Sequence, residues 1–192
     1  MAQLLRMILT VIAGVALGLG ATFFTVERGL GFGAVRTGAW TGWPKTGARD
    51  ADPYARAVLA RSGELPLGIA EGLTFVAKGE RQGSLFDPRC IYRVSDPLPQ
   101  ARYWTLTATK PDGRLIGNPA KRYGFTSSEI LRAADGSFEI VVASQVQPGN
   151  WLPVGANEPY LLVLHLFDTA MSATTSQLDR AGMPKITKGA CP

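Results

Sequence analysis

Residues 103–113 read YWTLTATKPDG, and this stretch decides the fold class. Trp104, Leu106 and Ala108 alternate with a tyrosine and two threonines, which is the period-two pattern of a strand with one buried face. The run stops at Pro111-Asp112-Gly113, where the residue types favour a tight turn. The stretch therefore predicts a β-strand that covers a core and ends in a turn.

The same pattern recurs further along the chain. In residues 136–144, GSFEIVVAS, the side chains of Phe138, Ile140 and Val142 share one face. Residues 159–168, PYLLVLHLFD, are apolar on both faces, as expected for a strand in the centre of a sheet.

Shorter strand candidates lie at residues 72–77 (GLTFVA) and 89–95 (RCIYRVS). Further turn signals are Ala134-Asp135-Gly136 and Pro148-Gly149-Asn150. Many short strands separated by turns predict a mainly β domain of the β-sandwich type.

Two local signals predict helix. Asp52 is a good N-cap and Pro53 is tolerated in the first turn, so residues 53–61 form a short helix that ends at Ser62-Gly63. Thr126-Ser127-Ser128-Glu129 has the pattern of a capping box, which predicts one or two helical turns.

Residues 7–26, MILTVIAGVALGLGATFFTV, contain no charge. At about 1.5 Å rise per residue they span about 30 Å, the thickness of a hydrocarbon core. Their glycines are normal in a membrane span, and Gly14 and Gly18 form a small-residue pair on which a second helix could pack. A cleaved signal peptide is the alternative, with small residues at Gly18, Gly20 and Ala21, but the apolar stretch is longer than a usual signal core.

The remaining chain follows from this anchor. We expect residues 1–6 in the cytoplasm, a Gly-rich tether over residues 27–50, and one domain over residues 51–192. Trp40 and Trp43 in the tether would pack on the domain or touch the lipid headgroups. The positive-inside rule does not orient the span, because more basic residues follow it than precede it.

Cys90 and Cys191 are the only cysteines. They lack the spacing of a zinc site, so no metal is expected. A disulfide that ties the C-terminal tail to the domain fits both positions, and two unrelated buried thiols are the alternative. A disulfide needs an oxidising compartment, which would place the domain in the bacterial periplasm.

Composition limits the partners. Of the 192 residues, 46% are hydrophobic and 18% charged, and the apolar excess lies at the N-terminus. The net charge is +5, but Lys and Arg are scattered singly, so we expect no nucleic acid partner. The expected partners are the bilayer and another membrane or envelope protein, reached through the Gly14/Gly18 face or the β-domain. No cofactor is expected.

Several segments occur in an order that is similar to one known family: YWTLTATKPDG, NPAKRYGF, DGSFEIVV, NWLP and the apolar strand ending in LHLFD. Over residues 68–168 the chain resembles domain of unknown function 1214, a module often fused behind domain of unknown function 1254. The resemblance implies a jelly-roll-like β-sandwich and no established activity. We expect a short form in which the membrane anchor and the short helix stand in place of the companion domain, and His165 stands where relatives usually have an arginine.

The polar and aromatic residues that match the family form the candidate ligand site: Asn118, Arg122, Tyr123, Asn150 and Trp151. Trp stacking and an Arg fork would suit a carbohydrate or another small polar ligand. The structural alternative is that both asparagines cap turns, that Arg122 pairs with Asp135, and that Trp151 closes one end of the sandwich.

A hydrolase is the least favoured function. His165 is the only histidine, and the sequence offers it no partner, although Ser144 beside it would revive the idea. Asp87, Asp96, Asp112 and Glu129 are dispersed among loops, so no acid pair for glycoside cleavage is expected. The favoured function is a non-enzymatic accessory or scaffold module.

Overall fold

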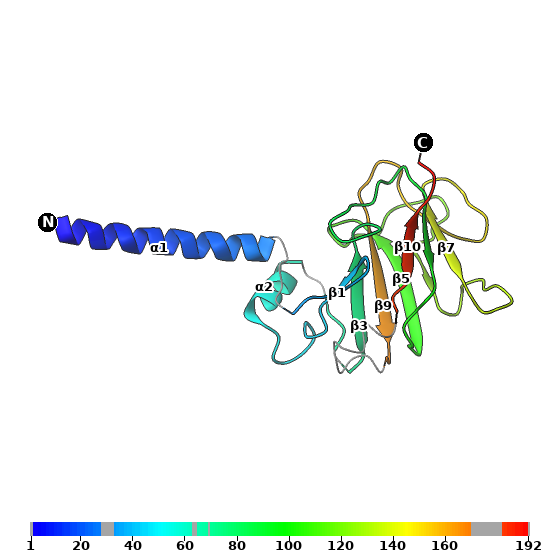
Figure 1. Ribbon diagram of the computed structural model, residues 1–192, viewed down its shortest axis with the longest axis horizontal. Helices are drawn as coiled ribbons and strands as arrows, with labels where there is room; N and C mark the ends of the chain where they lie inside the picture. Colours follow the sequence, from blue (N-terminus) through cyan, green and yellow to red (C-terminus); the bar gives the residue numbers. More distant parts are fainter. Residues whose placement is uncertain (1, 28–32, 63–64, 69, 170–181, 192) are drawn as a thin grey trace.

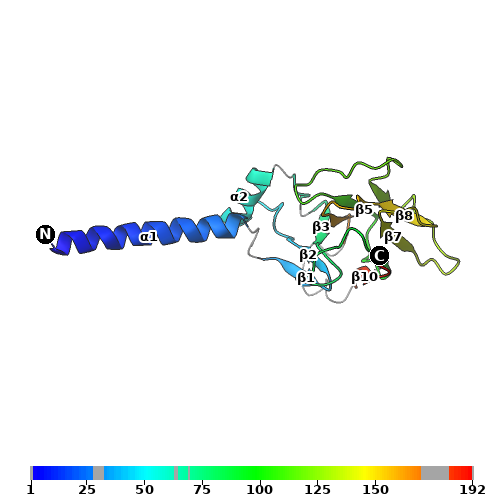
Figure 2. The ribbon, with the colours of Figure 1, turned by 90° about the horizontal axis from the view of Figure 1, so that it is seen from above.

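The structure is a computed structural model that describes residues 2–27, 33–62, 65–68, 70–169 and 182–191. These residues form two helices and ten strands. A long N-terminal helix, α1 (Ala2–Glu27), projects from a β-rich body, and the short helix α2 (Pro53–Ser62) lies beside its C-terminal end (Figures 1 and 2). The protein is therefore mainly β, with two sheets and one helix that extends away from them.

The larger sheet has six strands in the order β1-β2-β3-β9-β5-β6, and all of its pairs are antiparallel. Strand β9 lies inside this sheet, between β3 and β5, and corresponds to the stretch 159–168 that the sequence predicted to be a central strand. The strands are β1 (Val35–Thr37), β2 (Trp40–Gly42), β3 (Gly72–Ala77), β5 (Tyr103–Thr109), β6 (Gly124–Thr126) and β9 (Leu161–Phe167).

The smaller sheet has the order β10-β4-β7-β8. It contains β4 (Tyr92–Ser95), β7 (Glu139–Ala143), β8 (Asn150–Pro153) and β10 (Lys185–Lys188). The pair β7–β8 is parallel and the other two pairs are antiparallel. The expected alternation holds in β5, where Trp104, Leu106 and Ala108 are buried, whereas β7 is buried on both faces from Ile140 to Ala143.

One hydrophobic core lies between the two sheets. The larger sheet contributes Phe75, Leu106 and Leu164, and the smaller sheet contributes Val94 and Ile140, among others. The domain therefore depends on both sheets for its stability.

Residues 35–42 correct the expectation of a plain tether. They form the hairpin β1–β2, which pairs with β3 and extends the larger sheet. Trp40 is fully buried, and its indole nitrogen donates to the carbonyl of Pro184, 2.7 Å away. The prediction that a tryptophan packs on the domain is thus confirmed for Trp40.

Of the two predicted helical segments, one forms. α2 begins after Asp52, whose carboxylate accepts the backbone N–H groups of Tyr54 and Ala55 at 2.9 and 3.3 Å. Residues 127–129 form a turn instead of a helix. The two end residues of the predicted capping box do interact, since the Thr126 hydroxyl donates to the Glu129 carboxylate. Thr126 is, however, the last residue of a strand and pairs with Thr105 in the sheet, so no helix begins there.

α1 is long and apolar enough to cross a membrane, with a mean hydropathy of 2.2 over its most apolar window. None of that window is buried against the rest of the protein. A membrane anchor and an N-terminal signal sequence both have these properties.

The C-terminal end is tied to the domain by the predicted disulfide between Cys90 and Cys191, 101 positions apart. Backbone bonds continue the link, since Gly189 donates to Ile91 and Ile91 donates to Ala190. A disulfide is typical of a protein in an oxidising compartment.

Candidate functional site

The loop before β6 is organised by Asn118. Its side-chain oxygen accepts the backbone N–H of Arg122 at 3.1 Å, and its amide nitrogen donates to the carbonyls of Ile116 and Arg122. The side chain therefore closes a turn on itself, as the structural alternative predicted. In this arrangement its amide group serves the loop.

Asn150, at the start of β8, is 6% exposed. Its oxygen accepts the backbone N–H of Leu131 at 2.8 Å, and its nitrogen donates to the carbonyls of Leu131 and Glu139. Buried amides are normally bonded in this way. Asn150 holds the loop 127–137 against the smaller sheet, and its position in the interior makes it a structural residue.

Arg122 and Trp151 do come together. The guanidinium donates to the backbone carbonyl of Trp151 at 3.5 Å and lies 5.0 Å from the ring centre of Phe125. The indole nitrogen of Trp151 donates to the carbonyl of Ala143. Tyr123, the next residue along the chain, is exposed. Arg122 and Trp151 thus lie together, with Tyr123 adjacent to Arg122 in the sequence, and the two asparagines are engaged in other bonds.

The expected pair between Arg122 and Asp135 is wrong. The Asp135 carboxylate accepts two hydrogen bonds from Ser137, one from its hydroxyl and one from its backbone N–H. These bonds lower the pKa of Asp135. The local turn satisfies the acid, so it has no need of a distant arginine.

A groove that the sequence did not predict lies at the other end of β6. It has a volume of about 580 Å³ and is open to solvent. Two segments form its walls, residues 98–104 and residues 127–132, with Asp96 and Phe138 at the junction. We call this the β5–β6 groove. The antiparallel pairing of Thr105 with Thr126 explains it, because it brings the start of β5 beside the end of β6.

The β5–β6 groove carries two arginines. The Arg132 guanidinium lies 5.4 Å from the ring centre of Phe138 and donates to the carbonyl of Gly136, so it is held in place. Arg102 is exposed and lies 3.7 Å from the Asp168 carboxylate. Tyr103, 37% exposed, and the hydroxyls of Ser127 and Ser128 complete the polar lining. This set could bind a hydroxylated or anionic ligand.

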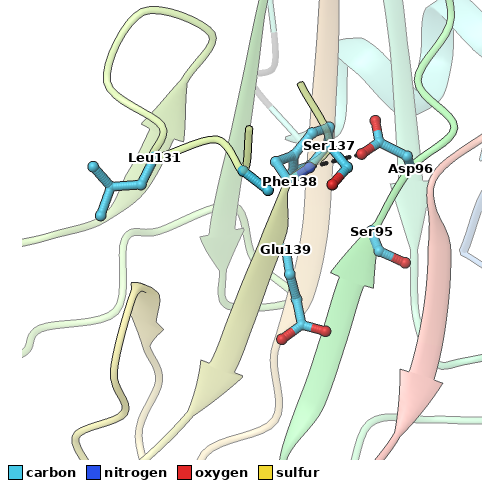
Figure 3. A pocket seen from close by; sticks show the side chains of 7 residues that line it. Ser95, Asp96, Leu131, Ser137, Phe138 and Glu139 are labelled. Carbon is cyan, nitrogen blue, oxygen red and sulfur yellow. Dashed lines mark hydrogen bonds between the residues drawn. The ribbon is translucent and has the colours of Figure 1, made fainter. Parts of the chain in front are cut away.

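A second, smaller hollow adjoins the first. It has a volume of about 360 Å³ and shares Asp96 and Phe138 with the β5–β6 groove. Figure 3 shows the Asp96 carboxylate accepting the backbone N–H of Phe138, at 2.7 Å, with Ser95 and Glu139 on the neighbouring strands. Asp96 therefore fixes the edge between the two hollows.

His165 lies mid-strand in β9 and is half-buried. Its Nδ1 is 2.9 Å from the Thr74 hydroxyl on β3, and burial lowers its pKa. The hydrogen bond therefore goes to a threonine of the neighbouring strand and not to Ser144. The structural interpretation of His165 fits this geometry.

The acids are also used locally. Asp87 and Asp112 each form an ion pair with an arginine two positions later, and the Asp87 pKa falls to about 2, chiefly through its hydrogen bonds with Arg89. In the part of the chain that the structure describes, no three metal-binding side chains gather.

The chain is similar to two solved structures of unassigned function. One is the VPA0106 protein from Vibrio parahaemolyticus, with a TM-score of 0.61 and 18% identity, over 92% of this chain and 44% of that protein. The other is an uncharacterised protein from Burkholderia cenocepacia, with a TM-score of 0.45 and 19% identity, over 91% of this chain and 50% of that protein. This chain thus spans half or less of their lengths, and the first likeness shows a shared fold alone.

No curated protein matches the sequence. A family model does, under the description "Protein of unknown function (DUF1214)", and the match covers residues 71–171. These residues hold β3 to β9, with the whole β5–β6 groove. Because the match covers more than half of the 192 residues, the chain belongs to the DUF1214 family of proteins of unknown function.

Proposed function

We propose that this protein is an anchored envelope module. In this proposal α1 stays uncleaved as a single-pass span of the bacterial inner membrane and holds the β-domain in the periplasm. The domain acts as a non-enzymatic accessory or scaffold that binds another membrane or envelope component.

The exposed apolar surface of α1 is the observation that supports the proposal most strongly. Helix α1 has 26 residues, and most of its large apolar side chains, such as Leu17, Leu19 and Phe23, are more than half exposed. Such a surface is unfavourable in water and needs lipid or protein around it. At about 1.5 Å per residue the helix is about 39 Å long, more than the hydrocarbon core requires.

The disulfide supports the periplasmic side. Cys90 is 1% exposed and Cys191 lies at the surface, so the bond joins the core to the tail. Thiols in a bacterial cytoplasm are kept reduced, whereas the periplasm oxidises them. A domain that carries this bond fits the periplasmic face of the membrane.

Protease treatment of spheroplasts tests the orientation. We expect external protease to degrade the β-domain in intact spheroplasts and to leave a short membrane fragment that contains α1. A domain that becomes accessible only after lysis would contradict the proposal. Purification in mild detergent tests the accessory role, because a strictly monomeric protein with no companion would count against it.

A second candidate function is the binding of a small polar ligand, such as a carbohydrate, and the β5–β6 groove favours it. Its volume of about 580 Å³ is in the usual range for ligand sites. Tyr103 offers a ring for stacking, and Arg102 and Arg132 offer charged donors.

Two arginine variants separate the groove from the cluster predicted from sequence. Ligand screening by thermal shift would use wild type, Arg132→Ala and Arg122→Ala. If the groove binds, Arg132→Ala reduces the shift and Arg122→Ala keeps it; the reverse result would assign binding to the cluster of Arg122, Tyr123 and Trp151. No shift with any ligand would contradict this second function.

The topology of the β-domain is a further part of the proposal. We propose a jelly-roll-like sandwich, supported by the single core shared between the two sheets. The parallel pair β7–β8 is the feature that an experimental structure should examine first, because jelly rolls are built from antiparallel strands.

A further inference from the structure

The segment from residue 33 to residue 62 holds most of the excess positive charge. It contains five Lys and Arg residues against two acids, whereas the whole chain has 20 against 15. All five basic residues are exposed: Arg36, Lys45, Arg49, Arg56 and Arg61. Four of the five, all except Arg36, lie in residues 43–62. We call these residues the basic collar; it comprises α2 and the loop before it.

The fold places the basic collar next to the anchor. α2 contacts α1, and both views show it at the C-terminal end of α1, between that helix and the sheets (Figures 1 and 2). Because the uncharged residues 7–26 span about the 30 Å of a hydrocarbon core, α1 ends at Glu27 where the core meets the headgroup layer. The basic collar then lies at the level of the headgroups.

The collar has a net positive charge, with four basic residues against two acids. One of its two acids, Asp52, is occupied as the N-cap of α2. The Arg56 guanidinium donates to the backbone carbonyl of Arg49, which ties α2 to the loop before it. Trp43, half-buried in the same segment, is a residue type that is enriched where membrane meets water.

We infer that the basic collar binds anionic phospholipid headgroups and thereby fixes the β-domain against the membrane surface. Basic residues next to a span are attracted to an anionic bilayer, and the attraction fades within about a Debye length, about 10 Å at 0.1 M salt. The collar meets this condition because α2 contacts α1 and lies at its C-terminal end. The inference rests on the proposal that α1 remains as the anchor.

Hydrogen exchange of the full chain in nanodiscs tests the inference. The chain would be reconstituted in phosphatidylcholine alone and in phosphatidylcholine with added phosphatidylglycerol. We expect amides of residues 43–62 to exchange about fivefold more slowly with the anionic lipid, and the difference to disappear at high salt. Amides of β5 should exchange equally in both discs.

Two triple variants of equal charge change provide the control. K45Q/R49Q/R56Q should lose the lipid-dependent protection, whereas K121Q/K185Q/K188Q, altered at exposed sites outside the collar, should keep it. Equal exchange of wild type in both lipids would overturn the inference, as would loss of protection in both variants. In wild type, the loss of lipid-dependent protection at high salt tests the inference without any variant, and protection that persists at high salt would contradict it. A chain that stays in neither disc would overturn the anchor itself, which is a different result.

Discussion

Asn150 and Tyr160 are both deeply buried, with exposed fractions of 6% and 2%, but their polar atoms differ in hydrogen bonding. The Asn150 amide makes three hydrogen bonds to backbone groups. The Tyr160 hydroxyl has no hydrogen-bond partner within the described residues. A sequence shows which residues are polar, but the partners come from distant loops, so this difference could not be predicted.

Removing the Tyr160 hydroxyl should therefore stabilise the domain or leave its stability unchanged. Tyr160→Phe keeps the ring stacked on Phe86 and deletes a buried atom that pays a desolvation cost. Tyr92→Phe is the matched control, because the Tyr92 hydroxyl accepts the backbone N–H of Asp87, and its loss should cost about 1 kcal/mol. Urea unfolding in detergent measures both. A larger loss for Tyr160→Phe than for Tyr92→Phe would show that Tyr160 has a partner.

Asn150→Ala should destabilise the domain by about 2–4 kcal/mol, since it removes the buried amide that bonds three backbone groups of Leu131 and Glu139. Asn118→Ala, in an exposed loop, should cost less. Thermal unfolding compares them. Equal, small losses would mean that water replaces the Asn150 bonds and that the residue is free for another role.

His165 should make stability depend on pH. Burial lowers its folded pKa below the ordinary value of 6.5. Above that value both states are neutral and the residue adds no pH dependence. Below it the unfolded chain takes up the proton first, so stability falls as the pH drops toward the folded pKa.

Urea unfolding at about pH 7.5 and about pH 5.5 measures this effect. We expect wild type to lose stability between the two, and His165→Gln to lose less. The lowered pKa values of Asp87, Asp112 and Asp135 act below their ordinary value of 3.8, outside this window. The same loss in both proteins would contradict the prediction.

At the scale of elements, the sequence predicted those whose signal is local or periodic. Strands β3, β5, β7 and β9 and helix α2 follow from alternation or from a cap. The hairpin β1–β2 has three residues per strand and gains its stability from pairing with β3, which no local pattern records. The turn after β6 differs from the predicted helix because the residue pattern of a capping box also fits a turn, in which the Thr126 hydroxyl donates to the Glu129 carboxylate.

The disulfide should matter most for β10, the edge strand that pairs with β4. Removing the bond by C90S/C191S opens a loop of about a hundred residues, and the chain-entropy model gives a loss of up to about 4.7 kcal/mol. Relative to wild type, we expect amide exchange in the cysteine variant to accelerate more in β10 than in β9. Asp52→Ala, which removes the cap of α2 at a cost of about 1 kcal/mol, is the control and should leave β10 unchanged. Unchanged exchange in the cysteine variant would show that pairing with β4 alone holds the strand.

At the scale of the whole molecule, the sequence predicted the family, the two-sheet β domain and the apolar helix. It predicted the surface less well. Arg122 and Trp151 do meet, but the asparagines serve the fold, and the β5–β6 groove arises from two segments about 25 positions apart that only strand pairing brings together. A site made by pairing has no continuous motif in the sequence.

The central claim is that α1 stays in the membrane and the domain folds in an oxidising compartment. Intact mass spectrometry of the protein from alkali-washed membranes, without reductant and after thiol alkylation, tests both halves together. The account predicts the mass of a chain that retains α1, less two hydrogens and without alkyl groups. A mass lacking α1 would show a cleaved signal sequence, and two alkyl groups would show free thiols; either result would contradict the account.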